Sequence, residues 1–158
     1  MKTLIATFFF SGISFLLLAQ NGNAPLAGAR GAGMAGTGLV IEDIYSSFSN
    51  QAGLAFLDGF AGGVTAEQRF QLQEIQLVGA AAAYPTGSGT FGLALSYFGF
   101  EAYNEQKIGL NYARLLTDNL SLGAQLNYLT TRIPNYGSAG TLSFELGLQA
   151  RIGEYLRL

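Results

Sequence analysis

Apolar residues alternate with small or polar residues along much of the second half of the chain. The pattern runs through residues 90–101, 105–116, 119–130 and 141–152. A period of two places successive side chains on opposite faces of a β-strand. The apolar face predicted in this way comprises Phe91, Leu93, Leu95, Tyr97, Ile108, Leu110, Tyr112, Leu120, Leu122, Ala124, Leu126, Tyr128, Leu142, Phe144, Leu146 and Leu148. These segments therefore predict strands that share one continuous apolar face.

Two earlier segments, residues 59–70 and 72–84, also have strand-like composition, although the first is weaker. Runs of turn residues, such as the Pro-Thr-Gly-Ser-Gly stretch at 85–89, separate neighbouring segments. Short connections join antiparallel neighbours. The sequence therefore predicts an all-β fold, an antiparallel up-and-down arrangement of six strands within residues 59–158.

The opposite face of these strands distinguishes between a membrane barrel and a soluble β protein. A soluble sandwich or lipocalin-like barrel turns its apolar face inward and covers its outer face with charged residues. Here the second face is mostly Gly, Ala, Ser, Asn and Gln, which suit a polar lumen. The lumen-facing polar residues predicted in this way are Lys107, Asn111, Gln125, Asn127, Glu145, Gln149 and Arg151. We expect the three charged members to neutralise one another, and the alternative is that they tune permeation or contact a plug. Replacing Gly147 or Gln125 by a small polar residue should cost less than Arg at Leu95 or Leu146.

Loop lengths and aromatic positions favour the same alternative, an outer-membrane barrel. The connections at 85–89 and 117–119 are short, whereas those at 100–106 and 132–140 are longer, as periplasmic turns and extracellular loops alternate in such barrels. Aromatic residues fall near strand ends in two predicted girdles. One girdle comprises Tyr84, Phe91, Tyr112 and Tyr155, and the other Tyr97, Phe98, Tyr128 and Phe144.

The first twenty residues have the three-part organisation of a secretory signal peptide. Lys2 precedes an apolar run that extends from Leu4 to Leu18, and the small residue Ala19 follows. Cleavage is expected after Ala19 or Gln20. An uncleaved anchor is the alternative, because Leu17 stands where a second small residue is preferred, although the run is shorter than the ~20 residues that span a bilayer.

Composition excludes several classes of function. The chain has no Cys and no His, which removes thiolate nucleophiles, imidazole bases and the common zinc ligand sets. A net charge of −2 provides no positive surface for phosphate backbones, so no nucleic acid partner is expected. The 49% hydrophobic content with only 11% charged residues indicates a surface that meets something other than water. In an outer-membrane barrel that partner is the outer-membrane lipid. We expect no enzymatic activity and no catalytic, cofactor or metal site.

Residues 21–58 form a Gly- and Ala-rich segment with no strand-like alternation. Ile41, Ile44, Tyr45 and Phe48 have helical spacing, which predicts a short amphipathic helix within Leu39–Phe48. Leu39, Ile41, Ile44 and Phe48 should then be more buried than Glu42 and Asp43. The segment would be a plug beneath the strands, and a flexible linker is the alternative.

A resemblance to a known family supports the plug interpretation. The Gly-rich run at 28–38 is followed by Asn50, Ala52, Gly53, Leu54 and Ala55, which match an Asn-Pro-Ala-Gly-Leu-Ala motif with Gln51 in place of proline. This arrangement resembles the PorV/PorQ branch, associated with type IX secretion, of the FadL-like outer-membrane transport proteins. The resemblance implies a location in the cell outer membrane and a role in protein secretion or in passage of a hydrophobic substrate. Secretion-machinery proteins or cargo would be the partners.

Asn50 should use its side-chain amide to hold the turn before the first strand, because Asn readily bonds local backbone groups. Six strands are fewer than the ~8 of the smallest single-chain outer-membrane barrels. The sequence therefore predicts the N-terminal part of a larger, incomplete barrel. Two other functions stay open: a soluble exported β-domain that binds an apolar ligand, and a nonfunctional fragment of a longer barrel.

Overall fold

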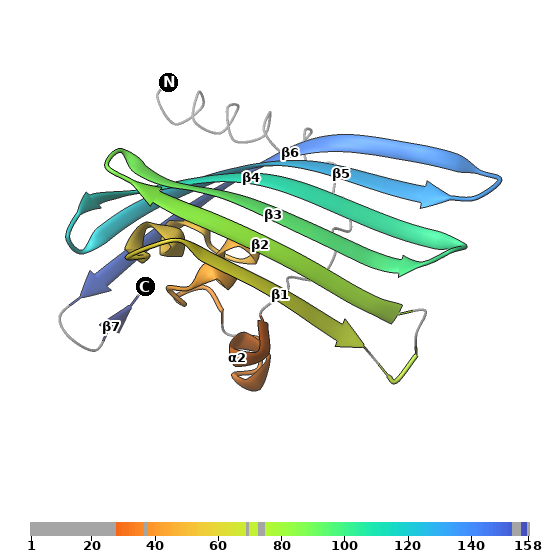
Figure 1. Ribbon diagram of the computed structural model, residues 1–158, viewed down its shortest axis with the longest axis horizontal. Helices are drawn as coiled ribbons and strands as arrows, with labels where there is room; N and C mark the ends of the chain where they lie inside the picture. The colour runs from red at the N-terminus through yellow and green to blue at the C-terminus, as the bar shows by residue number, and fades with distance from the viewer. Residues whose placement is uncertain (1–27, 37, 69, 73–74, 153–155, 158) are drawn as a thin grey trace, which may run out of the picture.

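The computed structural model contains one antiparallel sheet in which strands that follow one another in sequence are also neighbours in space (Figure 1). The strands are β1 (Ala61–Gln68), β2 (Gln76–Thr86), β3 (Gly89–Phe100), β4 (Tyr103–Thr117), β5 (Leu120–Ile133), β6 (Gly137–Ile152) and the two-residue β7 (Leu156–Arg157). The predicted antiparallel up-and-down sheet of six long strands is thus confirmed. Within the described residues β1 pairs with β2 and β7 with β6, and the sheet is not closed.

The structure describes residues 28–36, 38–68, 70–72, 75–152 and 156–157. The predicted signal peptide, residues 1–20, and Tyr155 of the first predicted girdle lie outside these residues. No helix in the described part of the chain is long and apolar enough to cross a bilayer.

The two faces of the sheet differ in both chemistry and exposure. Leu110 and Leu146 are 60% and 68% exposed, whereas Asn127 and Gln149 are fully buried. We call the exposed apolar side chains of β2–β6 the apolar belt and the opposite side of the sheet the polar face. In β3–β6 the belt includes Phe91, Leu93, Leu95, Tyr97, Ile108, Leu110, Tyr112, Leu122, Leu126, Tyr128, Leu142, Phe144, Leu146 and Leu148.

The strand register aligns three residues of the first predicted girdle in a single row across the sheet. Tyr84 pairs with Phe91 and Phe91 with Tyr112, and the ring centroids of the latter two are 5.0 Å apart. The prediction that Phe98 belongs to the second aromatic girdle is wrong. It pairs with the buried Leu77 and is half-buried, because the alternation of β3 turns it toward the polar face.

The predicted alternation of short and long loops is wrong, because the strands continue almost to their turns. Only residues 101–102 separate β3 from β4, and only 134–136 separate β5 from β6. Pro134 and Asn135 (φ 69°) occupy the centre of the second turn, where the Tyr136 amide donates to the Ile133 carbonyl at 3.0 Å. Proline followed by a residue of positive φ is characteristic of a type II turn. The polar residues around it extend the hairpin instead of forming a loop.

The described part of the segment before the sheet contains three short helices instead of one amphipathic helix. They are α2 (Gly28–Gly33) and the 3₁₀ helices η2 (Ile44–Phe48) and η3 (Gln51–Phe56). Asp43 caps η2 by accepting from the Tyr45 amide at 2.8 Å, so the helix begins after the predicted start. Leu39 therefore lies outside any helix and is 65% exposed, contrary to the prediction, whereas Ile41 and Ile44 are buried.

The hydrophobic core lies between this N-terminal segment and the polar face of the sheet. Ile44 and Leu54 pack there with Ala81, Ala83 and Ala113. The alanines leave space close to the sheet backbone for the larger side chains of η2 and η3. Figure 1 shows the 3₁₀ segments lying along one side of the sheet, where η3 contacts β4, β5 and β6.

Candidate functional site

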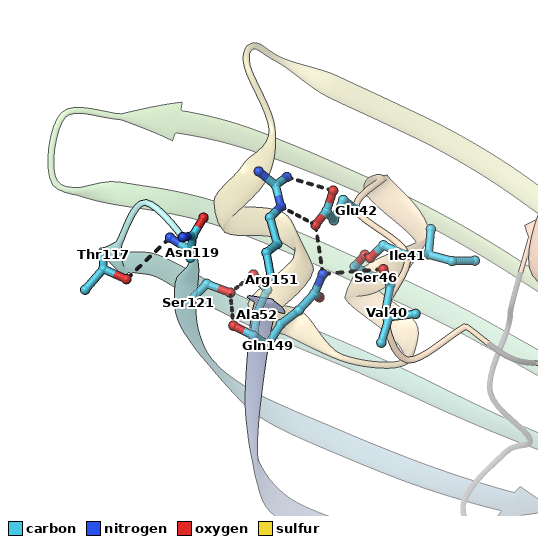
Figure 2. A network of polar contacts seen from close by, with 10 residues as sticks. All are labelled: Val40, Ile41, Glu42, Ser46, Ala52, Thr117, Asn119, Ser121, Gln149 and Arg151. Atoms are coloured by element: carbon cyan, nitrogen blue, oxygen red, sulfur yellow. Dashed lines mark hydrogen bonds and ion pairs between the residues drawn. The ribbon is translucent and has the colours of Figure 1, made fainter. Parts of the chain in front are cut away.

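The helix η3 is seated directly on the backbone of β5 and β6. A Cβ added at Gly123 would lie 2.3 Å from the Ala52 nitrogen, and one at Gly147 would lie 2.1 Å from Asn50 Oδ1. Only glycine permits such an approach at these two paired positions. The Ser121 hydroxyl completes the contact by donating to the Ala52 carbonyl at 2.9 Å (Figure 2).

Asn50 joins three parts of the chain through one side chain. Its Oδ1 accepts from the Ala52 amide at 3.2 Å and so caps η3. Its Nδ2 donates to the Leu39 carbonyl and to the Leu148 carbonyl of β6, both at 3.0 Å. The side chain thus holds the turn and attaches it to the sheet.

Gln51 occupies the first position of η3, where a proline would also be tolerated. Its side chain is 1% exposed and donates to Gln125 and, at 2.9 Å, to Glu145 Oε2. Glutamine therefore supplies hydrogen bonds to the polar face that proline would lack.

Glu145 is the centre of a polar cluster on β4, β5 and β6. Its Oε1 accepts from Lys107 Nζ at 2.9 Å and from Asn127 Nδ2 at 2.7 Å. Gln125 donates to Asn127 Oδ1 at 2.7 Å, which orients the amide. The hydrogen bonds that the Glu145 carboxylate accepts are charge-assisted, and such bonds are roughly twice as strong as neutral ones.

A second ion pair attaches the N-terminal segment to the end of β6. Arg151 Nε and Nη2 each donate to the Glu42 carboxylate at 2.7 Å, and Gln149 Nε2 donates to Glu42 Oε1 at 3.0 Å (Figure 2). The Arg151 guanidinium also lies 3.7 Å from the centre of the Phe56 ring. The charges predicted to neutralise one another thus divide into two pairs, Lys107 with Glu145 and Arg151 with Glu42.

The structure brings most of the predicted site residues into this one interface. Asn50, Ala52, Gly53 and Leu54 belong to or cap η3, and the predicted lumen-facing residues stand on the polar face. Asn111 is the exception, because its buried side-chain amide has no hydrogen-bond partner among the described residues. Sequence reasoning did not identify Glu42, Ser121 or the function of Gln51. Their partners lie 69 to 109 residues away in sequence, and no local signal indicates the pairing.

This interface is suited to holding a segment in place. In the described residues no group of three or more His, Cys, Asp or Glu side chains could hold a metal ion. Comparisons with protein-family models, with curated proteins and with solved structures found no match.

Proposed function

We propose that this chain forms part of the wall of an outer-membrane β-barrel, with residues 21–58 as a plug on the luminal side. The observation that supports it best is the polarity of the two faces. The apolar belt is exposed, while the covered face carries the Glu145 cluster and the Glu42–Arg151 pair. Transmembrane barrels have this arrangement, with apolar residues toward lipid and polar residues toward the lumen.

The remaining residues of the second predicted girdle, Tyr97, Tyr128 and Phe144, give independent support. In the strand register Tyr128 lies level with Leu95, and Phe144 lies level with Leu93. From Tyr97 to Tyr128 to Phe144, the aromatic position therefore shifts by two residues along the strand direction at each step. Strands in a barrel are tilted by roughly 35–45° from its axis. Such tilt brings an oblique line of side chains toward one membrane level, whereas the straight row of Tyr84, Phe91 and Tyr112 crosses levels, so only the second girdle fits this geometry.

The open edges of β1 and of β6, which β7 covers at only two residues, require partners within a bilayer, because unpaired backbone groups in lipid each cost several kcal/mol. The barrel we propose is therefore closed by additional strands. Its function would be protein secretion of the type IX kind, or passage of a hydrophobic substrate, as the sequence resemblance implies. A soluble protein that binds an apolar ligand receives less support, because it would enclose its apolar face instead of exposing it.

Cell fractionation tests the location. The full chain should appear with the outer membrane and require detergent for extraction, because the apolar belt contacts lipid. A control is an exported soluble protein produced from the same signal sequence. Recovery of this chain as a monodisperse soluble protein without detergent would contradict the proposal.

Solute leakage tests the plug. Removal of residues 28–48 detaches Glu42 from Arg151 and should increase leakage of small solutes from liposomes that contain the assembled barrel. The substitution Asp118→Asn, at an exposed position in the β4–β5 turn, serves as a control and should leave leakage unchanged. Equal leakage from the deletion variant and the unaltered protein would reduce the segment to a structural linker.

A further inference from the structure

An open cavity of about 510 Å³, lined by both polar and apolar residues, lies at the β5–β6 hairpin. The side chains that line it include Gln106 of β4, Thr130 and Arg132 of β5, and Ser138 of β6. The type II turn at Pro134 and Asn135 forms part of its wall, so one side of the cavity is conformationally restricted.

The cavity adjoins one boundary of the apolar belt, on the same face of the sheet. Thr130 and Arg132 lie two and four residues beyond Tyr128 on β5, and the alternation of the strand directs all three to one side. Ser138 pairs with Arg132 across the hairpin. The Tyr128 hydroxyl extends toward Gly140, where an added Cβ would lie 2.6 Å from it, so its ring spans the boundary between belt and cavity.

Arg132 gives the cavity a positive charge. It is the one charged residue among the described residues that line the cavity, and it is exposed. No described residue forms a hydrogen bond or ion pair with its guanidinium. Thr130, Ser138 and Gln106 add side-chain donors to the five N–H groups of the guanidinium.

We propose that this cavity binds the phosphate of an anionic lipid headgroup, an inference that rests on the proposed membrane location. The guanidinium fork matches the geometry of a phosphate, and the hydroxyl and amide groups provide further hydrogen bonds. The acyl chains of the same lipid would lie against Tyr128, Leu142 and Ile108 of the belt. A free anion would use only the first of these two contacts, whereas an anionic lipid uses both.

Lipid titration of the full chain in detergent micelles tests this proposal. The probes are fluorescent short-chain phosphatidic acid and phosphatidylcholine, and phosphatidic acid should bind more tightly. Arg132→Gln should weaken phosphatidic acid binding about five- to tenfold, and Arg132→Lys should weaken it less. Arg30→Gln, which removes the same charge from an exposed position on α2, should leave binding unchanged.

Two results would overturn the lipid proposal. The first is equal binding of the two lipids by the unaltered chain, which requires no variant to fold. The second is competition in which inorganic phosphate displaces phosphatidic acid at equal concentration, because this would indicate a free-anion site. Insertion of the same protein into vesicles is measured separately. Failure to enter the bilayer would contradict the proposed membrane location. Loss of discrimination between the two lipids would contradict lipid binding by the cavity.

Discussion

At the scale of single residues, the attachment of η3 depends on side chains with both a donor and an acceptor. The Asn50 amide accepts from Ala52 and donates to Leu39 and Leu148, a combination that an aspartate or serine cannot reproduce. The preference of Asn for turns made the local contact predictable from sequence. The bond to Leu148 was not predictable, because that carbonyl lies 98 residues away.

The substitution Asn50→Ala should lower the free energy of unfolding by about 2–3 kcal/mol, since it removes a helix cap and two further hydrogen bonds. Asn50→Ser should retain part of the cap but lose the bonds to Leu39 and Leu148, with an intermediate effect. Urea titration in micelles gives these energies. Equal stability of the three proteins would show that the side chain does not attach η3 to β6.

The substitution Gly123→Ala should cost about 1–3 kcal/mol, because the added Cβ would be placed 2.3 Å from the Ala52 nitrogen. Hydrogen exchange should show loss of protection in η3 while the β-strand amides remain protected. Gly87→Ala is the matched control, because its Cβ meets nothing within 4 Å. Unchanged protection of η3 in Gly123→Ala would contradict the close seating.

At the scale of elements, periodicity predicted the strands better than their ends. The alternation of apolar and polar residues identified β3–β6 and assigned their faces, because burial on one side imposes a period of two. It did not predict that β5 and β6 continue to Ile133 and Gly137, where both faces are polar. The prediction that Gly147 tolerates substitution is also wrong, because a Cβ there would collide with Asn50 Oδ1.

The substitution Leu146→Arg distinguishes lipid from water as the surroundings of β6. Near the middle of a lipid-facing strand it should cost about 2–4 kcal/mol, whereas at a water-exposed site it should change stability by less than about 0.5 kcal/mol. Tyr136→Arg, at a turn residue that is 90% exposed, is the control and should be neutral in both environments. Reversible unfolding from vesicles measures both. A neutral Leu146→Arg would argue for a water-exposed sheet.

At the scale of the whole molecule, the two surfaces of the sheet serve different environments. The N-terminal segment occupies the polar face through η3, Asn50 and the Glu42–Arg151 pair, while the apolar belt stays uncovered in the described structure. Exposed apolar surface of this extent marks an interaction with a membrane or a partner. Lipid is the partner we propose because the belt is continuous across four long strands and the opposite face is polar.

The most direct test of lipid contact is a nitroxide scan along β6 in vesicles. The chain has no cysteine, so single cysteines at positions 142 to 146, 148 and 149 can each be spin-labelled without removing a native thiol. Position 147 is omitted because only glycine fits against Asn50 there. Accessibility to oxygen, which concentrates in the bilayer, should be high at 142, 144, 146 and 148 and low at 143, 145 and 149. A water-soluble nickel reagent should not reach the first set. High nickel accessibility at 142, 144, 146 and 148, or no alternation at all, would contradict the account.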